Sequence, residues 1–355
     1  MDTHITIEER IATKAVAALH DKSGVHLELI DKNSVLGTGL WPDMRFRVAG
    51  SELELICEIK TGLNREMLEP TVRLLKSAAE GRPAMIMANY IDAKVGKSLR
   101  DLKVNYVDAS GNTYINLEPL FIFIEGQSIA DGLTQIKPAK LFSSTDLQVI
   151  YALLTNPSLL NENYREVAQC ANVALGVCGS VFRELKDQGY FVETVSSKRR
   201  EWRAKHKLIG RWVEQYPMLI KRTFLGEFSA PDFDWLRADG FSNFDAQLGG
   251  GPAVARYTQE AISNNVSVYV NDQQQWQFIR EMGLTKEEQN ELCATKPTIK
   301  VFSKFWGKGE LSQAESGSLY EDSVVHPLMA YAELIQTGDQ LSRDAANQIA
   351  SRYFV

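Results

Sequence analysis

Residues 41–60, WPDMRFRVAGSELELICEIK, contain two short runs typical of β-strands, and their polar positions include Asp43, Glu58 and Lys60. In the second run the apolar residues fall at every second position, namely Leu53, Leu55, Cys57 and Ile59. This alternation predicts one apolar face and places Glu58 and Lys60 together on the other face. Any half-exposed strand shows the same alternation, so the polar residues form either the solvent-facing side of an ordinary sheet or a functional site.

The segments around this stretch predict an α/β domain over residues 1–125. A helix is expected over residues 5–20, and further helices over 64–81, interrupted by Pro70, and 92–102. Strands are expected in VHLELI (25–30), PAMIMANYI (83–91), VNYVDASGNTYI (104–115) and LFIFI (120–124). Apolar strands that alternate with helices indicate a sheet covered on both faces. Residues 126–143 have weak periodicity and are interpreted as a linker.

Residues 144–207 follow the order of a winged helix-turn-helix. Three helical stretches, DLQVIYALLTN (146–156), NYREVAQCA (163–171) and VALGVCGSVFRELKDQG (173–189), are followed by two β-prone runs around a polar tip, YFVETV and SSKRREWRA. A short link joins the second and third helices, as in a helix-turn-helix. Such a domain places its third helix in the major groove of DNA and can lay its wing along the backbone.

The wing carries a basic cluster, KRREWRAKHK (198–207), with six Lys or Arg against one Glu in a chain of net charge −6. Clustered cations on one face neutralise phosphates. The candidate phosphate contacts are therefore Lys198, Arg199, Arg200 and Arg203. A solvated surface, or a contact with an acidic protein, would explain the same charges.

The residues of the third helix predict contacts with the DNA backbone rather than reading of the bases. Its exposed positions are mostly small, including Ser180, and long cations come only later, at Arg183 and Lys186. Reading of bases by paired hydrogen bonds needs Arg, Asn, Gln or Lys near the helix start. Asn172 is the only such residue there, and an N-cap role would explain it equally well.

Residues 208–355 predict a mixed α+β domain without a catalytic constellation. In DAQLGGGPAVARYTQEA (245–261), three glycines and a proline precede a helix, a pattern that can hold an anion. The lysine of a phosphate-binding P-loop is missing, which argues against a nucleotide site. His326 is interpreted as structural, and the last two helices are expected to meet at Gly338.

Composition places the chain in the cytoplasm. Its 355 residues predict two or three domains. MDTHITIEER, at the start, has neither the charge pattern of a transit peptide nor that of a secretory signal, and no run approaches the roughly eighteen apolar residues of a membrane-spanning helix. The four cysteines, Cys57, Cys170, Cys178 and Cys293, lack metal-ligand spacing and are too few for a disulfide framework.

Several stretches resemble one bacterial family: RPAMIMANYI (82–91) with LKVNYVDASGNTYIN (102–116), the winged segment, GGGPAVARYT (249–258) and HPLMAYAELIQTGDQLSRDAA (326–346). Together, over roughly residues 80–350, they are similar to the AbiEi-like antitoxins and transcriptional regulators of type IV toxin-antitoxin systems. NYVDASGNTYIN is the most specific part. The resemblance implies a regulator that binds double-stranded DNA and acts beside the product of a nucleotidyltransferase-type toxin gene.

The first domain also resembles the PD-(D/E)xK nuclease superfamily, because Pro42-Asp43 precedes one strand and Glu58-Ile59-Lys60 ends the next. The resemblance implies that Asp43 and Glu58 hold Mg²⁺ and that Lys60 positions or activates the attacking water. Glu8 or Glu9 would supply the additional acid of some members.

Three hypotheses follow from the sequence. The first is a cytoplasmic DNA-binding transcriptional regulator. The second is a Mg²⁺-dependent DNA endonuclease to which the winged domain delivers the substrate. The third is an interaction protein whose basic wing meets an acidic partner. Fold alone does not separate them, because one fold supports several functions.

Overall fold

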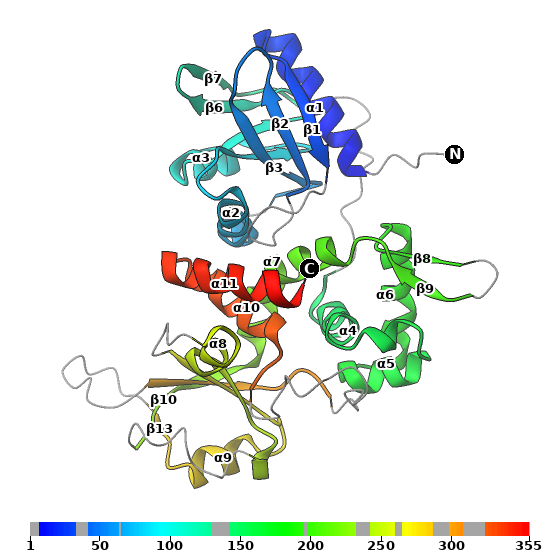
Figure 1. Ribbon diagram of the computed structural model, residues 1–355, viewed down its shortest axis with the longest axis vertical. Helices are drawn as coiled ribbons and strands as arrows, with labels where there is room; N and C mark the ends of the chain where they lie inside the picture. The colour runs from blue at the N-terminus through cyan, green and yellow to red at the C-terminus, as the bar shows by residue number, and fades with distance from the viewer. Residues whose placement is uncertain are drawn as a thin grey trace. The chain divides into compact units, whose positions relative to one another are not determined.

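The computed structural model divides the chain into two units, residues 1–140 and residues 141–355. The residues that it describes are 7–32, 42–63, 65–129, 142–194, 198–231, 242–259, 265–286, 298–307 and 324–354. Figure 1 shows both units and labels most of their helices and strands.

The first unit is built on a seven-stranded mixed sheet in which the spatial order follows the chain order. Its strands are β1 (Leu27–Lys32), β2 (Met44–Val48), β3 (Glu54–Lys60), β4 (Ala84–Ala88), β5 (Asn105–Asp108), β6 (Thr113–Leu117) and β7 (Leu120–Ile124). β3, β4 and β5 run parallel, whereas the strands on either side of them pair antiparallel. Parallel pairs need crossover connections, and the two helices that follow β3 and β4 supply them.

Helices cover both faces of this sheet. α1 (Ile7–Ser23) buries Ile11, Ala15 and Leu19 against one face, in a core shared with Leu55 and Ile59 of β3. α2 (Arg65–Ala79) and α3 (Ala93–Asp101) cover the other face (Figure 1). The α/β domain with two covered faces is therefore confirmed.

The interruption expected at Pro70 is wrong, because α2 continues through it. A proline inside a helix removes one backbone hydrogen bond. Here that loss is offset by the buried face of α2, where Leu68, Val72 and Leu75 pack against Ile56 of β3.

The second unit begins with three α-helices, a 3-10 helix and a hairpin. They are α4 (Ser144–Thr155), the 3-10 helix η1 (Pro157–Leu160), α5 (Tyr164–Ala171), α6 (Leu175–Asp187), β8 (Phe191–Glu193) and β9 (Arg200–Trp202). β8 and β9 pair antiparallel, with Phe191 opposite Trp202. We refer to residues 142–203 as the α4–β9 block. Residues 130–141 of the expected linker and residues 195–197 of the expected wing lie outside the described residues.

The rest of the second unit is an α+β region, as expected. Its elements are α7 (Lys205–Thr223), β10 (Phe224–Ser229), η3 (Ser242–Phe244), β11 (Gln247–Gly250), α8 (Gly251–Thr258), β12 (Val266–Val270), α9 (Gln275–Glu281), β13 (Thr285–Lys286), β14 (Thr298–Ser303), α10 (Pro327–Thr337) and α11 (Gln340–Tyr353). The sheet has the order β11-β12-β14-β10-β13, in which β12 and β14 pair parallel. Gly338 has a φ of 76° and separates the last two helices, as expected.

The α4–β9 block and the α+β region share a core. α7 crosses the expected domain border at residue 207, and its buried Trp212 donates a hydrogen bond from Nε1 to the Leu147 carbonyl of α4 at 2.9 Å. The Trp212 ring also stacks on Tyr151 of α4, with 5.3 Å between ring centroids. The backbone N–H of Gly307 donates to the Cys170 carbonyl at 2.9 Å and ties the α+β region to the end of α5.

Candidate functional site

α6 exposes small residues near its start and a cation later, as the sequence predicts. Cys178, Val181, Phe182 and Leu185 are buried. Ser180 and Arg183 are exposed on the opposite side. The Ser180 hydroxyl donates to the Val177 carbonyl at 2.8 Å, so its proton is used within the helix.

The N-cap role considered for Asn172 is wrong. Asn172 ends α5 in the left-handed conformation, with a φ of 53°, and Ala174 is the residue that precedes α6. Asparagine tolerates this conformation better than most residues, which explains its place in the link. Its side chain is exposed at the start of α6.

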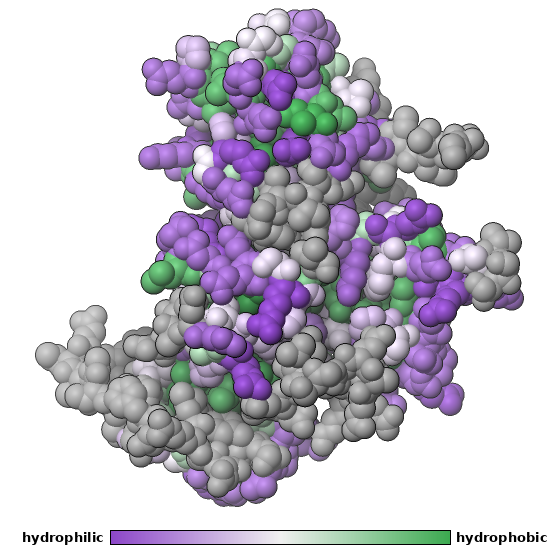
Figure 2. Space-filling view, in the orientation of Figure 1, coloured by the Kyte–Doolittle hydropathy of each residue, from purple (hydrophilic) through white to green (hydrophobic). Residues whose placement is uncertain are grey.

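The hairpin exposes Lys198 and Arg199 at its tip, and Arg203 is exposed just after β9. The tip is held by backbone hydrogen bonds from Thr194 to Arg199 and from Lys198 to Thr194, at 2.9 and 2.8 Å. Around β8 and β9 the surface in Figure 2 is mostly hydrophilic. Three cations are thereby presented from one short segment, a suitable arrangement for contacts with phosphates.

Arg200 is engaged within the fold rather than presented to solvent. Its guanidinium lies 4.6 Å from the ring centroid of Phe182 and 5.5 Å from that of Tyr164. It also donates to the Leu160 carbonyl at 3.0 Å, while its backbone N–H donates to Asn161 Oδ1 at 2.7 Å. Arg200 therefore fixes β9 against α5, α6 and η1.

Lys186 also has a partner within the block. Its Nζ lies 2.8 Å from Oε2 of Glu193 on β8, and this contact lowers the pKa of the Glu193 carboxyl. The pair is solvent-exposed, so it adds little stability. A contact between Lys186 and a phosphate would first have to replace this pair.

We expect Arg200→Ala to lower the free energy of unfolding of the second unit by about 1–2 kcal/mol, because it removes two cation–π contacts and a hydrogen bond. Arg199→Ala, at the neighbouring exposed position, should change it by less than about 0.5 kcal/mol. Urea denaturation followed by circular dichroism measures both. Equal effects of the two substitutions would contradict the structural role of Arg200.

Asp43, Glu58 and Lys60 lie at the same end of the β2–β3 pair, where Met44 is opposite Cys57. Asp43 precedes β2 and accepts a hydrogen bond at Oδ2 from the backbone N–H of Ile59, at 2.7 Å. Glu58 Oε1 lies 2.8 Å from Lys60 Nζ. Asp43 and Lys60 are each 5% exposed. Asp43 and Lys60 are therefore buried rather than open to solvent.

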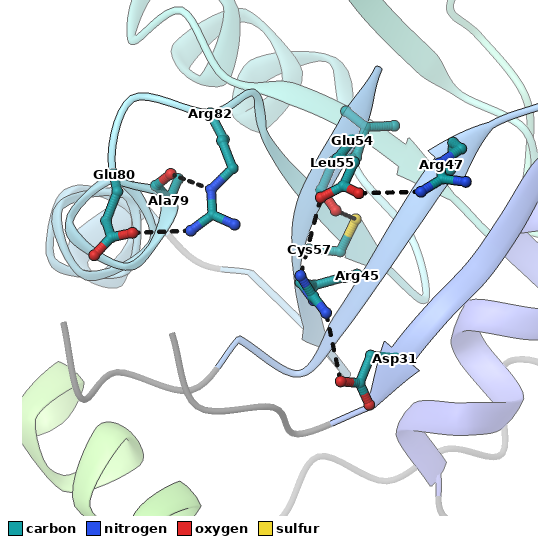
Figure 3. Close-up of polar contacts among 9 residues, drawn as sticks. All are labelled: Asp31, Arg45, Arg47, Glu54, Leu55, Cys57, Ala79, Glu80 and Arg82. Atoms are coloured by element: carbon teal, nitrogen blue, oxygen red, sulfur yellow. Dashed lines mark hydrogen bonds and ion pairs between the residues drawn. The ribbon is translucent and has the colours of Figure 1, made fainter. Parts of the chain in front are cut away.

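The arginines beside this cluster pair with other acids (Figure 3). Arg45 contacts Asp31 at 3.5 Å and Glu54 at 3.9 Å, and Arg47 contacts Glu54 at 3.3 Å. In the described ranges no group of three or more His, Cys, Asp or Glu side chains is placed to hold one metal ion. Asp43 and Glu58 are thus not part of such a group among the described residues.

The segment NYVDASGNTYIN has a structural role. The Asp108 carboxylate is fully buried and accepts hydrogen bonds from the backbone N–H groups of Ile91, Ser110 and Asn112, at 2.8 to 2.9 Å. It also accepts one from Asn112 Nδ2 at 2.7 Å. Burial raises the pKa of Asp108, while these hydrogen bonds oppose the rise. Asp108 therefore joins the β5–β6 turn to the segment that leads from β4 into α3.

The glycine turn of the second unit contacts a carboxylate of the same chain. The backbone N–H of Gly250 donates to Glu333 Oε2 of α10 at 2.7 Å, and Tyr269 donates to Glu333 Oε1 at 2.6 Å. A Cβ atom at Gly249 would lie 2.8 Å from Glu333 Oε2. The glycines thus admit Glu333 to the start of α8, and a phosphate there would compete with this carboxylate.

His326 caps α10, which supports its structural interpretation. Its Nδ1 accepts a hydrogen bond from the backbone N–H of Leu328 at 3.1 Å. Burial, with a smaller contribution from the charge of Lys205, lowers the pKa of His326 to about 3. The imidazole is therefore neutral in the folded chain at neutral pH.

The stability of the second unit should fall on acidification below about pH 6.5, because His326 binds a proton in the unfolded chain before it can do so in the folded chain. One such group lowers the free energy of unfolding by up to about 1.4 kcal/mol for each pH unit. His326→Asn keeps an acceptor at the cap and does not titrate. Between pH 7 and pH 5.5 the free energy of unfolding, measured by urea denaturation, should fall less for this variant than for the unmodified chain. An equal fall in the two proteins would exclude His326 as the cause.

One part of the chain matches a family model. Residues 203–355 match the family described as "Transcriptional regulator, AbiEi antitoxin, Type IV TA system". The match covers α7 and the α+β region, so it confirms this portion of the resemblance expected over roughly residues 80–350. No curated protein and no solved structure matches the chain. Among the described helices, none is long and apolar enough to cross a membrane.

Proposed function

We propose that the chain is a cytoplasmic transcriptional regulator that binds double-stranded DNA through the α4–β9 block and acts as the antitoxin beside a toxin gene product. The observation that carries this proposal is the match of residues 203–355 to a family of transcriptional regulators and type IV antitoxins. The α4–β9 block directly precedes that match, and its helices and hairpin follow the order of a winged helix-turn-helix.

Contacts with phosphates dominate the proposed binding. Lys198, Arg199 and Arg203 are the cations for the backbone, and Arg183 adds one from α6. Such contacts orient a protein on duplex DNA without reading its sequence. The internal contacts of Arg200 and Lys186 favour structural roles for these two residues.

A retardation assay tests this function. The purified chain should retard a duplex taken from the DNA upstream of its own coding sequence, and a reporter driven by that DNA should be repressed when the chain is produced. Lys221→Ala with Arg222→Ala, which removes two exposed cations at the end of α7, is the control and should behave as the unmodified chain. Absence of retardation of any duplex at low salt would exclude the function and favour the interaction-protein hypothesis.

We infer a second candidate activity, Mg²⁺-dependent DNA cleavage in the first unit, from the hydrogen bond that joins Asp43 to Ile59, the residue between the paired Glu58 and Lys60. Two carboxylates at one sheet end can hold a hard divalent cation, and the neighbouring lysine can orient a water molecule. Plasmid DNA incubated with the chain in Mg²⁺ should then be cut, whereas EDTA or Glu58→Ala should prevent cutting. Intact plasmid, together with a melting temperature that Mg²⁺ leaves unchanged, would exclude the activity.

A further inference from the structure

The start of α6 lacks side-chain hydrogen-bond donors. Its first six residues, LGVCGS, include only two polar side chains, the Cys178 thiol and the Ser180 hydroxyl. Cys178 is fully buried, and Ser180 donates its proton to the Val177 carbonyl. These two turns therefore offer no donor to the acceptor atoms that guanine, adenine and thymine present in the major groove.

An exposed leucine stands at the first position of the helix. Leu175 is 51% exposed, although leucine is usually buried in a folded chain. Of the other apolar or aromatic side chains of α6, those of Val181, Phe182 and Leu185 are buried in the core of the block, and the smaller Val177 is half-buried. Leu175 is thus the large apolar group that the N-terminal turn of α6 presents to a ligand.

Exposed cations on α6 and on the hairpin favour a polyanion as the ligand. Arg183 is exposed two turns later on the same helix, and Lys198, Arg199 and Arg203 are exposed on the hairpin that packs beside α6. In DNA, the apolar group that a base edge presents in the major groove is the 5-methyl group of thymine. An apolar side chain that reaches the groove between phosphate-binding cations therefore meets this methyl group.

We infer that Leu175 contacts thymine methyl groups, so that the chain favours A·T pairs beneath the start of α6. This inference rests on the proposed DNA binding through the α4–β9 block and adds a sequence preference to it. It makes Leu175 a specificity-determining residue. The preference comes from burial of methyl groups rather than from paired hydrogen bonds, so it is modest.

Two matched pairs of duplexes test the inference by fluorescence anisotropy. The first pair is an alternating A·T duplex and the same duplex with deoxyuridine in place of thymidine, which removes only the methyl groups. The second is an alternating G·C duplex with or without 5-methylcytosine, which adds the same methyl group. We expect the methylated member of each pair to bind about fourfold more tightly for each contacted methyl group, the value for one buried carbon.

Leu175→Ala should bring both ratios close to one while leaving the salt dependence of binding unchanged. Alanine favours helix formation and position 175 is exposed, so the variant should fold normally. The control is Leu341→Ala on α11, where the leucine is 65% exposed, and it should keep the ratios of the unmodified chain.

Failure of this inference can be told apart from failure of the proposed function. Equal binding of the members of both pairs, with binding that still weakens as salt rises, would overturn the role of Leu175 and leave DNA binding intact. Ratios that survive Leu175→Ala would assign the preference to DNA shape and also overturn it. Absence of binding to all four duplexes would overturn both proposals.

Discussion

Replacing Trp212 with alanine should lower the free energy of unfolding of the second unit by about 3–5 kcal/mol, the range observed when a buried aromatic residue is replaced by alanine. Trp212 is fully buried between the α4–β9 block and the α+β region. The substitution removes its stacking on Tyr151 and its contact with Tyr216, whose ring centroid lies 5.6 Å away. It also leaves the Leu147 carbonyl without the indole N–H that it accepts.

Urea denaturation followed by far-ultraviolet circular dichroism measures this loss without relying on tryptophan fluorescence. Trp276→Ala is the matched control, because Trp276 on α9 is 66% exposed. Its substitution should change the free energy of unfolding by less than about 0.5 kcal/mol. Similar effects of the two tryptophan substitutions would show that Trp212 does not hold the two parts of the second unit together.

Asp108→Ala should destabilise the first unit by about 3–5 kcal/mol, because it leaves buried donors without an acceptor. Four hydrogen bonds end on this one carboxylate, and they come from Ile91, Ser110 and Asn112. Loss of the acceptor would therefore loosen the β5–β6 turn and the segment after β4 together.

Asp101→Ala is the control for this prediction. Asp101 lies at the exposed end of α3 and pairs with Lys97 one turn earlier, at 2.8 Å. A pair of this kind contributes only about 0.3–0.5 kcal/mol. Thermal denaturation of the two variants should therefore differ clearly. A loss of stability for Asp108→Ala no larger than that for Asp101→Ala would show that Asp108 does not hold the β5–β6 turn to the segment after β4.

The architecture of the first unit could be predicted because periodicity reports burial. Alternation in β3 places Leu55 and Ile59 on one face and Glu58 on the other, as the structure shows. Periodicity cannot reveal what covers a face, however. The face that carries Glu58 also carries Ile56, which packs under α2, so Lys60 is buried rather than exposed to solvent.

The contacts of individual cations could not be predicted from the sequence. Lys198, Arg199 and Arg200 form one charged run, but Arg200 alone belongs to β9 and reaches the rings of Tyr164 and Phe182. Those rings lie more than fifteen residues earlier in the chain. For the same reason the contact of the glycine turn with Glu333 could not be predicted from the residues around either of them.

The exposure of Leu175 could not be predicted from the sequence either. Along α6, Leu175 falls close to the apolar positions that form the core, and its sequence neighbours do not distinguish it from them. Only the packing of the α4–β9 block shows that this leucine stays at the surface. The proposed sequence preference therefore depends on the structure, whereas the proposed phosphate contacts were visible as a basic cluster.

The salt dependence of DNA affinity tests the central claim most directly, because every phosphate contact that is lost lowers the slope of log affinity against log salt concentration. Affinity for one duplex should be measured across a salt series for the unmodified chain and for Lys198→Ala with Arg199→Ala. The double variant should bind more weakly, with a slope reduced by up to about two. The control, Lys221→Ala with Arg222→Ala, should keep the original slope. If the hairpin variant retains both affinity and slope while the control loses them, DNA binding through the α4–β9 block is contradicted.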